Sequence, residues 1–142
     1  MAGYSGTPLP KKLGIKPAQR VALFNPPADF LQTLGELPAG VELLADPSSG
    51  PALDVIVFFT TALAQLKKRF AALAKRLAPA GGLWIAWPKK ASGVATDLTE
   101  DVIRVVGLDA GLVDNKVCAI DDTWSGLRFV IRLQDRPARP AK

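Results

Sequence analysis

The stretch WPKKASGVATD, at residues 87–97, brings together side chains that suit the binding of an anion. It combines two positive charges, two hydroxyls and a glycine that permits an unusual turn, on Lys89, Lys90, Ser92, Thr96 and Gly93. The stretch follows an apolar run of strand length and precedes a helical pattern, where free backbone amides also favour an anion. It is therefore our first candidate for an anion or nucleotide site, although paired lysines on a loop are often only solvated.

The tripeptide Asn25-Pro26-Pro27 ends the apolar run RVALFN. In enzymes that methylate the amino group of adenine, an Asn-Pro-Pro-aromatic sequence grips the flipped base. Here Ala28 stands where the aromatic residue belongs, and the tripeptide follows the first expected strand rather than a later one. We therefore predict a structural role, in which Asn25 ends the strand and Pro27 begins a helix, while Asn25 still borders the candidate pocket.

Two acidic stretches are weaker candidates for a site. Asp46, in LLADP, would hold ribose hydroxyls if a nucleotide bound, but a lone Asp before Pro is usually a turn former. The connection DDTWS would bring Trp124 to the same edge of the sheet as a stacking or lid residue. Adjacent aspartates on a strand end point to opposite sides, so a turn is the plainer reading and we predict no metal site.

The sequence contains no recognisable catalytic set. It has no histidine and one cysteine, which excludes Ser-His-Asp and Cys-His nucleophiles, the common zinc ligand sets and an internal disulfide. Cys118 alternates with its neighbours in an apolar stretch and is predicted to be a small core residue. We assign no catalytic residue and no cofactor, and we leave the status of the chain as an enzyme open while favouring a binding role.

The elements that position these residues alternate between strands and helices. Apolar runs predict strands in RVALFN, VELL, LDVIVFF and LWIAW, and the third is apolar on both parities, as in a central parallel strand. Helical spacing predicts helices from Pro27, in TALAQLKKRFAALAKRLAP, and from Leu98 to Gly111, where Asp97 and Glu100 would form a capping box. VDNKVCAI and SGLRFVIRL follow as two strands joined by a short connection.

This order predicts one α/β domain, because 142 residues are enough for one core and too few for two. We expect a single Rossmann-like domain at residues 17–134, with a mostly parallel sheet, helices on both faces and a C-terminal antiparallel hairpin. Residues 1–16 are expected to form a leader with a short helix, and residues 135–142 a disordered tail.

The positive charge is concentrated in one segment. Residues 61–78 contain five bases and no acid, and the net charge of the chain is +5. This segment is either a solvated helix face or a surface for nucleic acid or an acidic partner. It lacks aromatic residues on its polar side, which favours the solvated face and makes nucleic acid the weaker candidate. Its apolar stripe, from Leu63 to Leu77, packs on the sheet or forms a dimer seam.

The sequence gives no sign of a membrane protein. Its uncharged stretches are far shorter than the roughly 20 apolar residues of a membrane span, and its start is polar. We therefore expect a soluble, cytoplasmic protein. Its oligomeric state is left open.

Three stretches resemble a bacterial family catalogued as domain of unknown function 3052: GYSGTPLPKKLGIK at residues 3–16, WPKKASGVATDLTE at 87–100 and VDNKVCAIDDTWSGLRFV at 113–130. The resemblance covers nearly all of the chain, implies a bacterial cytoplasmic protein and brings no catalytic residue. In addition, LAPAGGLWIAWP and the terminal hairpin are similar to the second half of class I methyltransferases that use S-adenosylmethionine. Those enzymes carry Gly-x-Gly-x-Gly after the first strand, whereas Asn-Pro-Pro stands here, which argues against ordinary S-adenosylmethionine binding.

We therefore predict a non-catalytic Rossmann-like module that binds an anionic small molecule or a protein partner at the edge carrying Lys89 and Lys90. Two alternatives remain open. One is a divergent methyltransferase-like enzyme acting with a nucleotide-like cofactor, and the other is a nucleic-acid-associated regulator that uses the basic helix.

Overall fold

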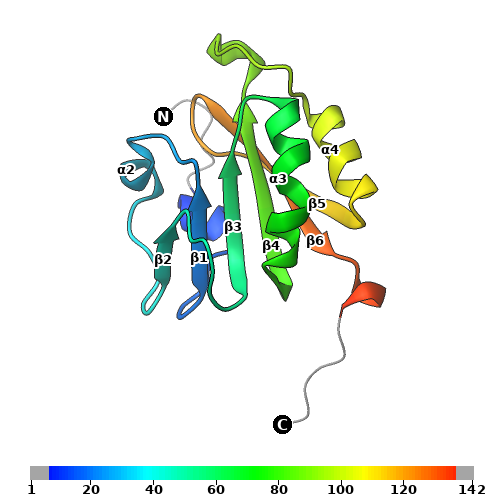
Figure 1. The fold of residues 1–142 in the computed structure, drawn as a ribbon. Coiled ribbons are helices and arrows are strands. Elements are labelled where there is room, and N and C mark those ends of the chain that lie inside the picture. Colours follow the sequence, from blue (N-terminus) through cyan, green and yellow to red (C-terminus); the bar gives the residue numbers. More distant parts are fainter. Residues whose placement is uncertain (1–6, 137–142) are drawn as a thin grey trace.

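A six-stranded sheet with the order β2-β1-β3-β4-β6-β5 forms the centre of the structure, a computed structural model that describes residues 7–136 (Figure 1). The strands are β1 (Arg20–Phe24), β2 (Glu42–Ala45), β3 (Leu53–Phe59), β4 (Leu77–Pro88), β5 (Leu112–Ala119) and β6 (Trp124–Ile131). The first four run parallel, and β6 is antiparallel to both β4 and β5. The predicted parallel sheet with a C-terminal antiparallel hairpin is confirmed.

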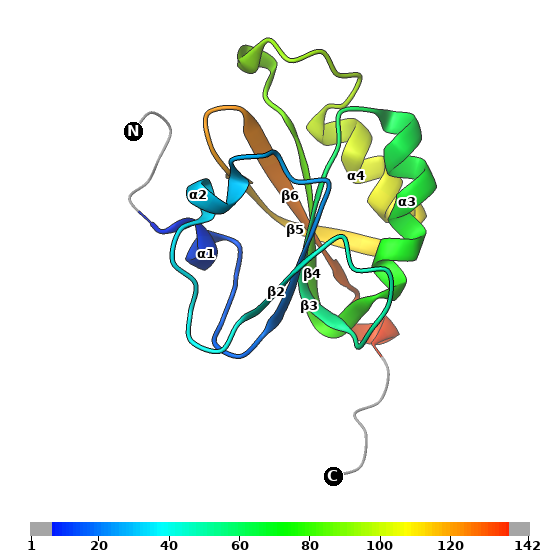
Figure 2. The same ribbon diagram turned by 60° about the vertical axis from the view of Figure 1, so that its left-hand side comes forward.

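Helices cover both faces of the sheet, but unequally. They are α1 (Leu9–Lys12), α2 (Phe30–Leu34), α3 (Leu63–Lys75) and α4 (Glu100–Asp109), with short 3-10 turns at Lys90–Ser92 and Leu133–Asp135. The long helices α3 and α4 lie on one face, and the single-turn helices α1 and α2 lie on the other (Figure 2). No helix of the described residues is long and apolar enough to span a membrane.

The sheet separates two hydrophobic clusters, and β3 contributes to both. Ile56 and Phe58 point toward α3, whereas Val57 and Phe59 point toward α1 and α2, and all four are buried. This is the central strand that the sequence predicts, since a strand covered on both faces is apolar on both parities. The stripe on α3 also packs on the sheet, with Leu66, Phe70 and Leu73 buried.

Three boundaries differ from the sequence expectations. The helix expected from Pro27 begins at Phe30, because residues 27–30 form a turn in which the Phe30 N–H donates to the Pro27 carbonyl at 3.1 Å. β4 begins at Leu77, which pairs with Leu53 instead of extending the helical stripe. The helix expected from Leu98 to Gly111 runs from Glu100 to Asp109.

Residues 1–6 and 137–142 lie outside the described residues, and with them lie the first six residues of the predicted leader and most of the predicted tail. Within the described part, α1 is the only helix before β1, and residues 133–135 form the last 3-10 turn.

Candidate functional site

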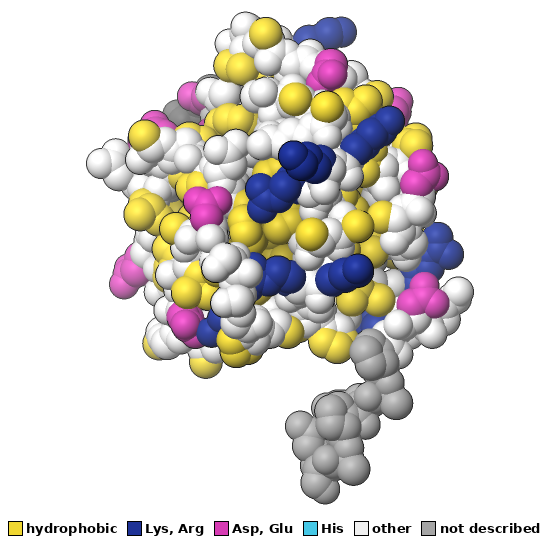
Figure 3. Space-filling view, in the orientation of Figure 1, with side chains coloured by type: hydrophobic (Ala, Val, Ile, Leu, Met, Phe, Trp, Pro, Cys, Tyr) yellow, Lys and Arg dark blue, Asp and Glu magenta, His cyan; other side chains and the backbone are white. Residues whose placement is uncertain are grey.

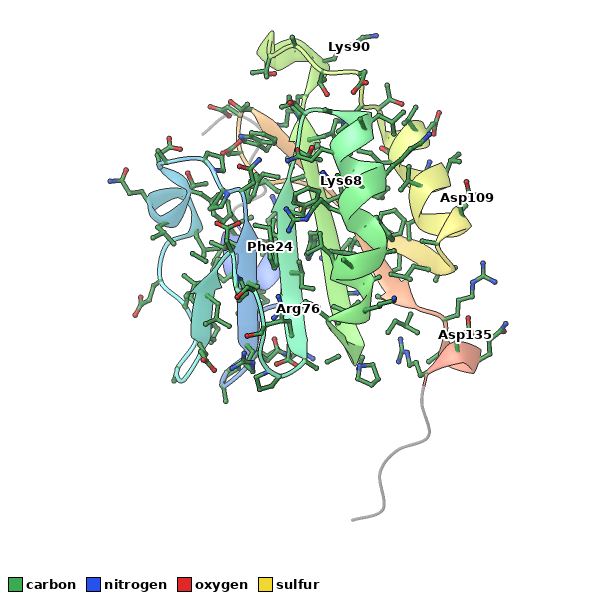
Figure 4. The ribbon with its side chains drawn as sticks, viewed as in Figure 1. Phe24, Lys68, Arg76, Lys90, Asp109 and Asp135 are labelled. Carbon is green, nitrogen blue, oxygen red and sulfur yellow. The ribbon has the colours of Figure 1, made fainter. Side chains whose placement is uncertain are left out.

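The carboxyl ends of β1, β3 and β4 meet at one edge of the sheet. Phe24 pairs with Phe58 and Phe59 with Ala86, and the Thr60 N–H donates to the Ala86 carbonyl at 3.0 Å. The residues that follow these strands therefore share this edge. The loop after β4 projects from it, and Figure 4 shows Lys90 at that end of the molecule, with Arg76 toward the opposite end.

A cleft of about 520 Å³ lies between the loop after β4 and the start of α4. Much of its lining is apolar and comes from Trp87, Pro88, Val94 and Leu98. Its polar lining residues include Lys90, Thr96, Thr99 and Glu100. Of the predicted site residues, Lys90, Gly93 and Thr96 line this cleft, whereas Lys89, Ser92, Asn25 and Trp124 do not.

Both hydroxyls predicted in this loop shape the loop itself. Ser92 Oγ donates to the Lys89 carbonyl at 2.6 Å and accepts from the Val94 N–H at 3.2 Å. Thr96 Oγ1 donates to the Thr61 carbonyl at 2.5 Å and accepts from the Leu98 N–H at 3.1 Å. The contact of Thr96 with Thr61 fixes the loop against the start of α3, while the contacts of Ser92 stay within the loop. Both hydroxyls therefore already have hydrogen-bond partners within the protein.

The start of α4 is capped by Thr99, whose Oγ1 accepts from the Val102 N–H at 3.2 Å. The predicted capping box of Asp97 and Glu100 is therefore wrong. Asp97 instead accepts from the Leu63 N–H of α3 at 2.8 Å. The threonine two residues later is equally able to cap a helix, and the sequence pattern alone does not choose between them.

An ion-pair network that the sequence analysis missed joins α4 to β5. Arg104 contacts Glu100 at 2.5 Å, Asp101 at 2.9 Å and Asp114 at 3.0 Å. The hydrogen bond that Arg104 donates to Glu100 is the largest cause of its raised pKa, followed by the one it donates to Asp114. The four-residue spacing of Glu100 and Arg104 could have indicated this pair in the sequence, since residues four apart are neighbours on a helix. Glu100 therefore reaches the cleft as a carboxylate that already has a partner.

Asn25 holds the strand ends together. Its backbone is left-handed, with φ at 57°, and its N–H donates to Asp46 Oδ1 at 3.0 Å. Its side-chain Nδ2 donates to the Phe59 carbonyl at 3.0 Å. These contacts give Asn25 a structural function between β2 and β3, and they engage the Asp46 carboxylate that would otherwise be available for a ribose.

Trp124 and Lys89 lie next to the cleft without lining it. The Trp124 ring packs edge-on against Phe59, with centroids 5.2 Å apart, on the face that carries α1 and α2. Asp121 Oδ1 accepts from the N–H groups of both Thr123 and Trp124 at 2.8 Å, which is a turn of the predicted kind. The Lys89 N–H donates to the Thr123 carbonyl at 2.7 Å and so ties the loop to the hairpin.

The basic helix does more than face solvent. Figure 3 shows Lys and Arg side chains gathered over the face that carries α3. The Arg69 guanidinium lies 5.6 Å from the centroid of the Phe24 ring and 5.4 Å from that of Phe58. The Arg69 side chain thus packs over aromatic residues of β1 and β3. This cation–π contact also holds its guanidinium group in place.

Solved structures of methyltransferases have the same arrangement of elements. The ribosomal protein L11 methylase of Lactobacillus delbrueckii subsp. bulgaricus is similar with a TM-score of 0.61 and 14% identity, over 87% of this chain and 74% of that chain. A SAM-dependent methyltransferase from Aquifex aeolicus has a TM-score of 0.57 and 17% identity, over 84% and 85%. A TehB-like SAM-dependent methyltransferase from Corynebacterium glutamicum has a TM-score of 0.56 and 11% identity, over 92% and 91%.

No family model and no curated protein matches the sequence. The resemblance to domain of unknown function 3052 therefore stays a prediction. At identities this low, the structural likeness establishes the fold alone. The chain has the α/β Rossmann-like fold of the class I S-adenosylmethionine-dependent methyltransferases.

Proposed function

We propose that the chain is a non-catalytic Rossmann-like binding module, and that its cleft beside Lys90 takes a small molecule with an apolar body and an anionic group. The observation that carries this proposal is the composition of the cleft, in which Lys90 borders a lining formed by Trp87, Pro88 and Leu98. In open α/β sheets, ligands bind beyond the carboxyl ends of the strands, and this cleft lies there.

The size and charge of the cleft support a small anionic ligand. A volume of about 520 Å³ lies within the range of sites for small molecules, which are mostly apolar with a few polar groups that fix orientation. None of the ion pairs of residues 7–136 includes Lys90, whereas Glu100 is paired with Arg104. The positive charge is therefore the unmatched one at this cleft.

The contacts of Asn25 support a role other than ordinary S-adenosylmethionine binding. At the end of β1, methyltransferases carry glycines that allow the cofactor to approach the backbone. Here the Asn25 side chain donates to the Phe59 carbonyl and its N–H donates to Asp46. These groups stabilise the strand ends in place of a cofactor contact.

A divergent methyltransferase-like enzyme with a nucleotide-like cofactor is the second candidate, and the fold similarity favours it. Calorimetry with S-adenosylmethionine and S-adenosylhomocysteine separates the two candidates. The binding module predicts no heat of binding with either molecule. A one-to-one binding isotherm with either would favour the enzyme.

The cleft itself is tested with benzoate and phenyl phosphate, which each join an aromatic ring to an anionic group. We expect a saturable NMR shift of the Trp87 indole N–H, lost in Lys90→Glu and retained in Lys89→Glu. The second variant is the matched control, because Lys89 carries the same charge but does not line the cleft. Absence of a shift with both probes, or equal loss in both variants, would contradict the proposal. An acidic protein partner would contact Lys90 without filling the cleft and would leave Trp87 unshifted.

A further inference from the structure

A second cleft, of about 320 Å³, lies next to the end of the single-turn helix α1. Figure 2 shows α1 on the face of the sheet opposite α3 and α4. Four cations line it: Lys12, Lys16, Lys116 and Arg128. Among its described lining residues Asp54 is the one carboxylate, and Asp54 Oδ2 already accepts from the Arg20 N–H at 2.8 Å. This cleft shares no lining residue with the cleft beside Lys90.

An irregularity in β5 sends opposite charges to opposite faces of the sheet. Asp114 pairs with Phe129 and Lys116 pairs with Arg128, so Asn115 is an extra residue in β5. In a regular strand Asp114 and Lys116 would share a face. Here Asp114 accepts from Arg104 Nε of α4 at 3.0 Å, while Lys116 lines the cleft on the other face. The bulge thus separates Lys116 from the carboxylate two positions before it.

Lys116 and Arg128 lie directly opposite each other in the antiparallel pair. Like charges at such positions destabilise a sheet. Neither residue takes part in any ion pair of residues 7–136. Arg128 Nη1 donates to Asn115 Oδ1 at 3.3 Å, and Lys116 Nζ donates to the Lys12 carbonyl at 3.2 Å. Both acceptors are uncharged, so the two positive charges remain uncompensated.

Gly82 provides the space in which Arg128 lies against the sheet. A Cβ atom at Gly82 would stand 2.3 Å from Arg128 Nε, so any larger residue would displace the guanidinium. The Arg128 side chain is half-buried; this burial is the main cause of its lowered pKa, and repulsion from Arg136 adds to it. Partial burial of a cation without a counter-charge is unfavourable. A bound anion would offset both this cost and the repulsion from Arg136.

We propose that the cleft beside α1 binds a small polyanion of the phosphate class, with Arg128 and Lys116 as its principal contacts and Lys12 and Lys16 at its rim. The planar guanidinium matches two phosphate oxygens at once, and several cations favour a ligand with more than one negative charge. A cleft of about 320 Å³ lies at the small end of ligand sites, which suits a phosphate or pyrophosphate group. This site is separate from the one proposed at the carboxyl edge.

Calorimetry with pyrophosphate, inorganic phosphate and citrate tests this site on the full chain. We expect one-to-one binding of pyrophosphate that weakens about tenfold or more in Lys116→Gln and in Arg128→Gln. Lys68→Gln, which removes the same charge from the exposed side of α3, is the matched control and should stay within about twofold. Lys90→Glu should leave the binding of pyrophosphate unchanged. The proposal for this cleft can therefore be refuted independently of the proposal for the cleft beside Lys90.

Thermal unfolding gives a second test, in which removal of a charged residue is expected to raise the Tm. In anion-free buffer of low ionic strength, Lys116→Gln should raise the Tm because it removes one of two like charges at paired positions of β5 and β6. Pyrophosphate should raise the Tm of the wild type but not of this variant. The proposal is overturned if neither phosphate compound binds, if Lys68→Gln weakens binding as much as Lys116→Gln, or if Lys116→Gln lowers the Tm in anion-free buffer. Tighter binding of citrate than of pyrophosphate would refute the phosphate class.

Discussion

Asp97 accepts a hydrogen bond from the Leu63 N–H at 2.8 Å, so a residue of the loop after β4 caps a helix that precedes it in the chain. The N-cap position of α3 is Ala62, which has no side-chain acceptor. Thr96 adds a second contact to the same region through the Thr61 carbonyl. The loop that borders the cleft beside Lys90 is therefore anchored by two neighbouring residues.

Substitution Asp97→Ala should lower the free energy of unfolding by about 1 kcal/mol, the usual effect of removing a helix cap. Urea denaturation measures it. Asp122→Ala is the control, because Asp122 is exposed in the connection between β5 and β6 and should change stability by less than about 0.5 kcal/mol. Equal effects of the two substitutions would show that the contact with Leu63 does not stabilise α3.

Two substitutions at Asn25 separate its side chain from its backbone. Asn25→Gly loses the hydrogen bond to Phe59 but accommodates the φ of 57°, and should lose about 1 kcal/mol of stability. Asn25→Ala loses the same bond and also strains the left-handed backbone, which adds about 1 kcal/mol. Denaturant unfolding should therefore rank the wild type above the glycine variant and the glycine variant above the alanine variant. The reverse order of the two variants would mean that the backbone conformation is not under strain.

Gly107→Ala should destabilise the protein although alanine is the better helix former. A Cβ atom there would stand 2.0 Å from the Phe129 ring, and a clash in a packed core costs about 1–3 kcal/mol, against a gain of about 1 kcal/mol in helix propensity. Val105→Ala on the exposed side of α4 is the control and should be neutral or slightly stabilising. Thermal unfolding of both variants checks the sign, and a Gly107→Ala protein as stable as the control would show that Phe129 moves aside freely.

The pKa of Cys118 predicts a loss of stability at alkaline pH. Burial raises this pKa, and the charges of Lys12 and Lys116 partly oppose the rise. As pH rises, the thiol of the unfolded chain, with a pKa of about 8.5, loses its proton before the thiol of the folded protein does. Deprotonation therefore favours the unfolded chain. The stability that this thiol contributes below about pH 8.5 is lost as pH rises through the pKa of the folded state. Unfolding free energies between about pH 7 and pH 10 should fall more steeply for the wild type than for Cys118→Ala. Parallel curves would contradict the raised pKa.

The sequence predicts the parts of this fold that depend on periodicity. β3 is recognisable because it is apolar on both parities, and α3 because Leu66, Phe70 and Leu73 recur at helical spacing. The hairpin follows from two apolar runs without a helix between them. Each of these signals is local, and the packing in the structure agrees with it.

Contacts between residues that are far apart in the sequence are not predictable in this way. Asp97 fits the pattern of a local capping box, yet its partner is Leu63, 34 residues earlier. The bulge at Asn115 lies in a polar stretch whose register with β6 no local pattern fixes. The cations of the cleft beside α1 come from three separate segments, so each looks like an ordinary surface charge until the strands are paired.

The helical cover of the sheet is unequal, with two long helices on one face and two single-turn helices on the other. Helices of four and five residues are marginal without tertiary contacts, so α1 depends on anchors such as the hydrogen bond from the Trp84 indole to the Leu13 carbonyl at 3.0 Å. Amide exchange should accordingly reveal local opening around α1 at a lower free energy than around α3 and α4. The cations of the cleft beside α1 thus lie next to the helix that is expected to open first, so exchange of a bound molecule would depend on the local stability of α1.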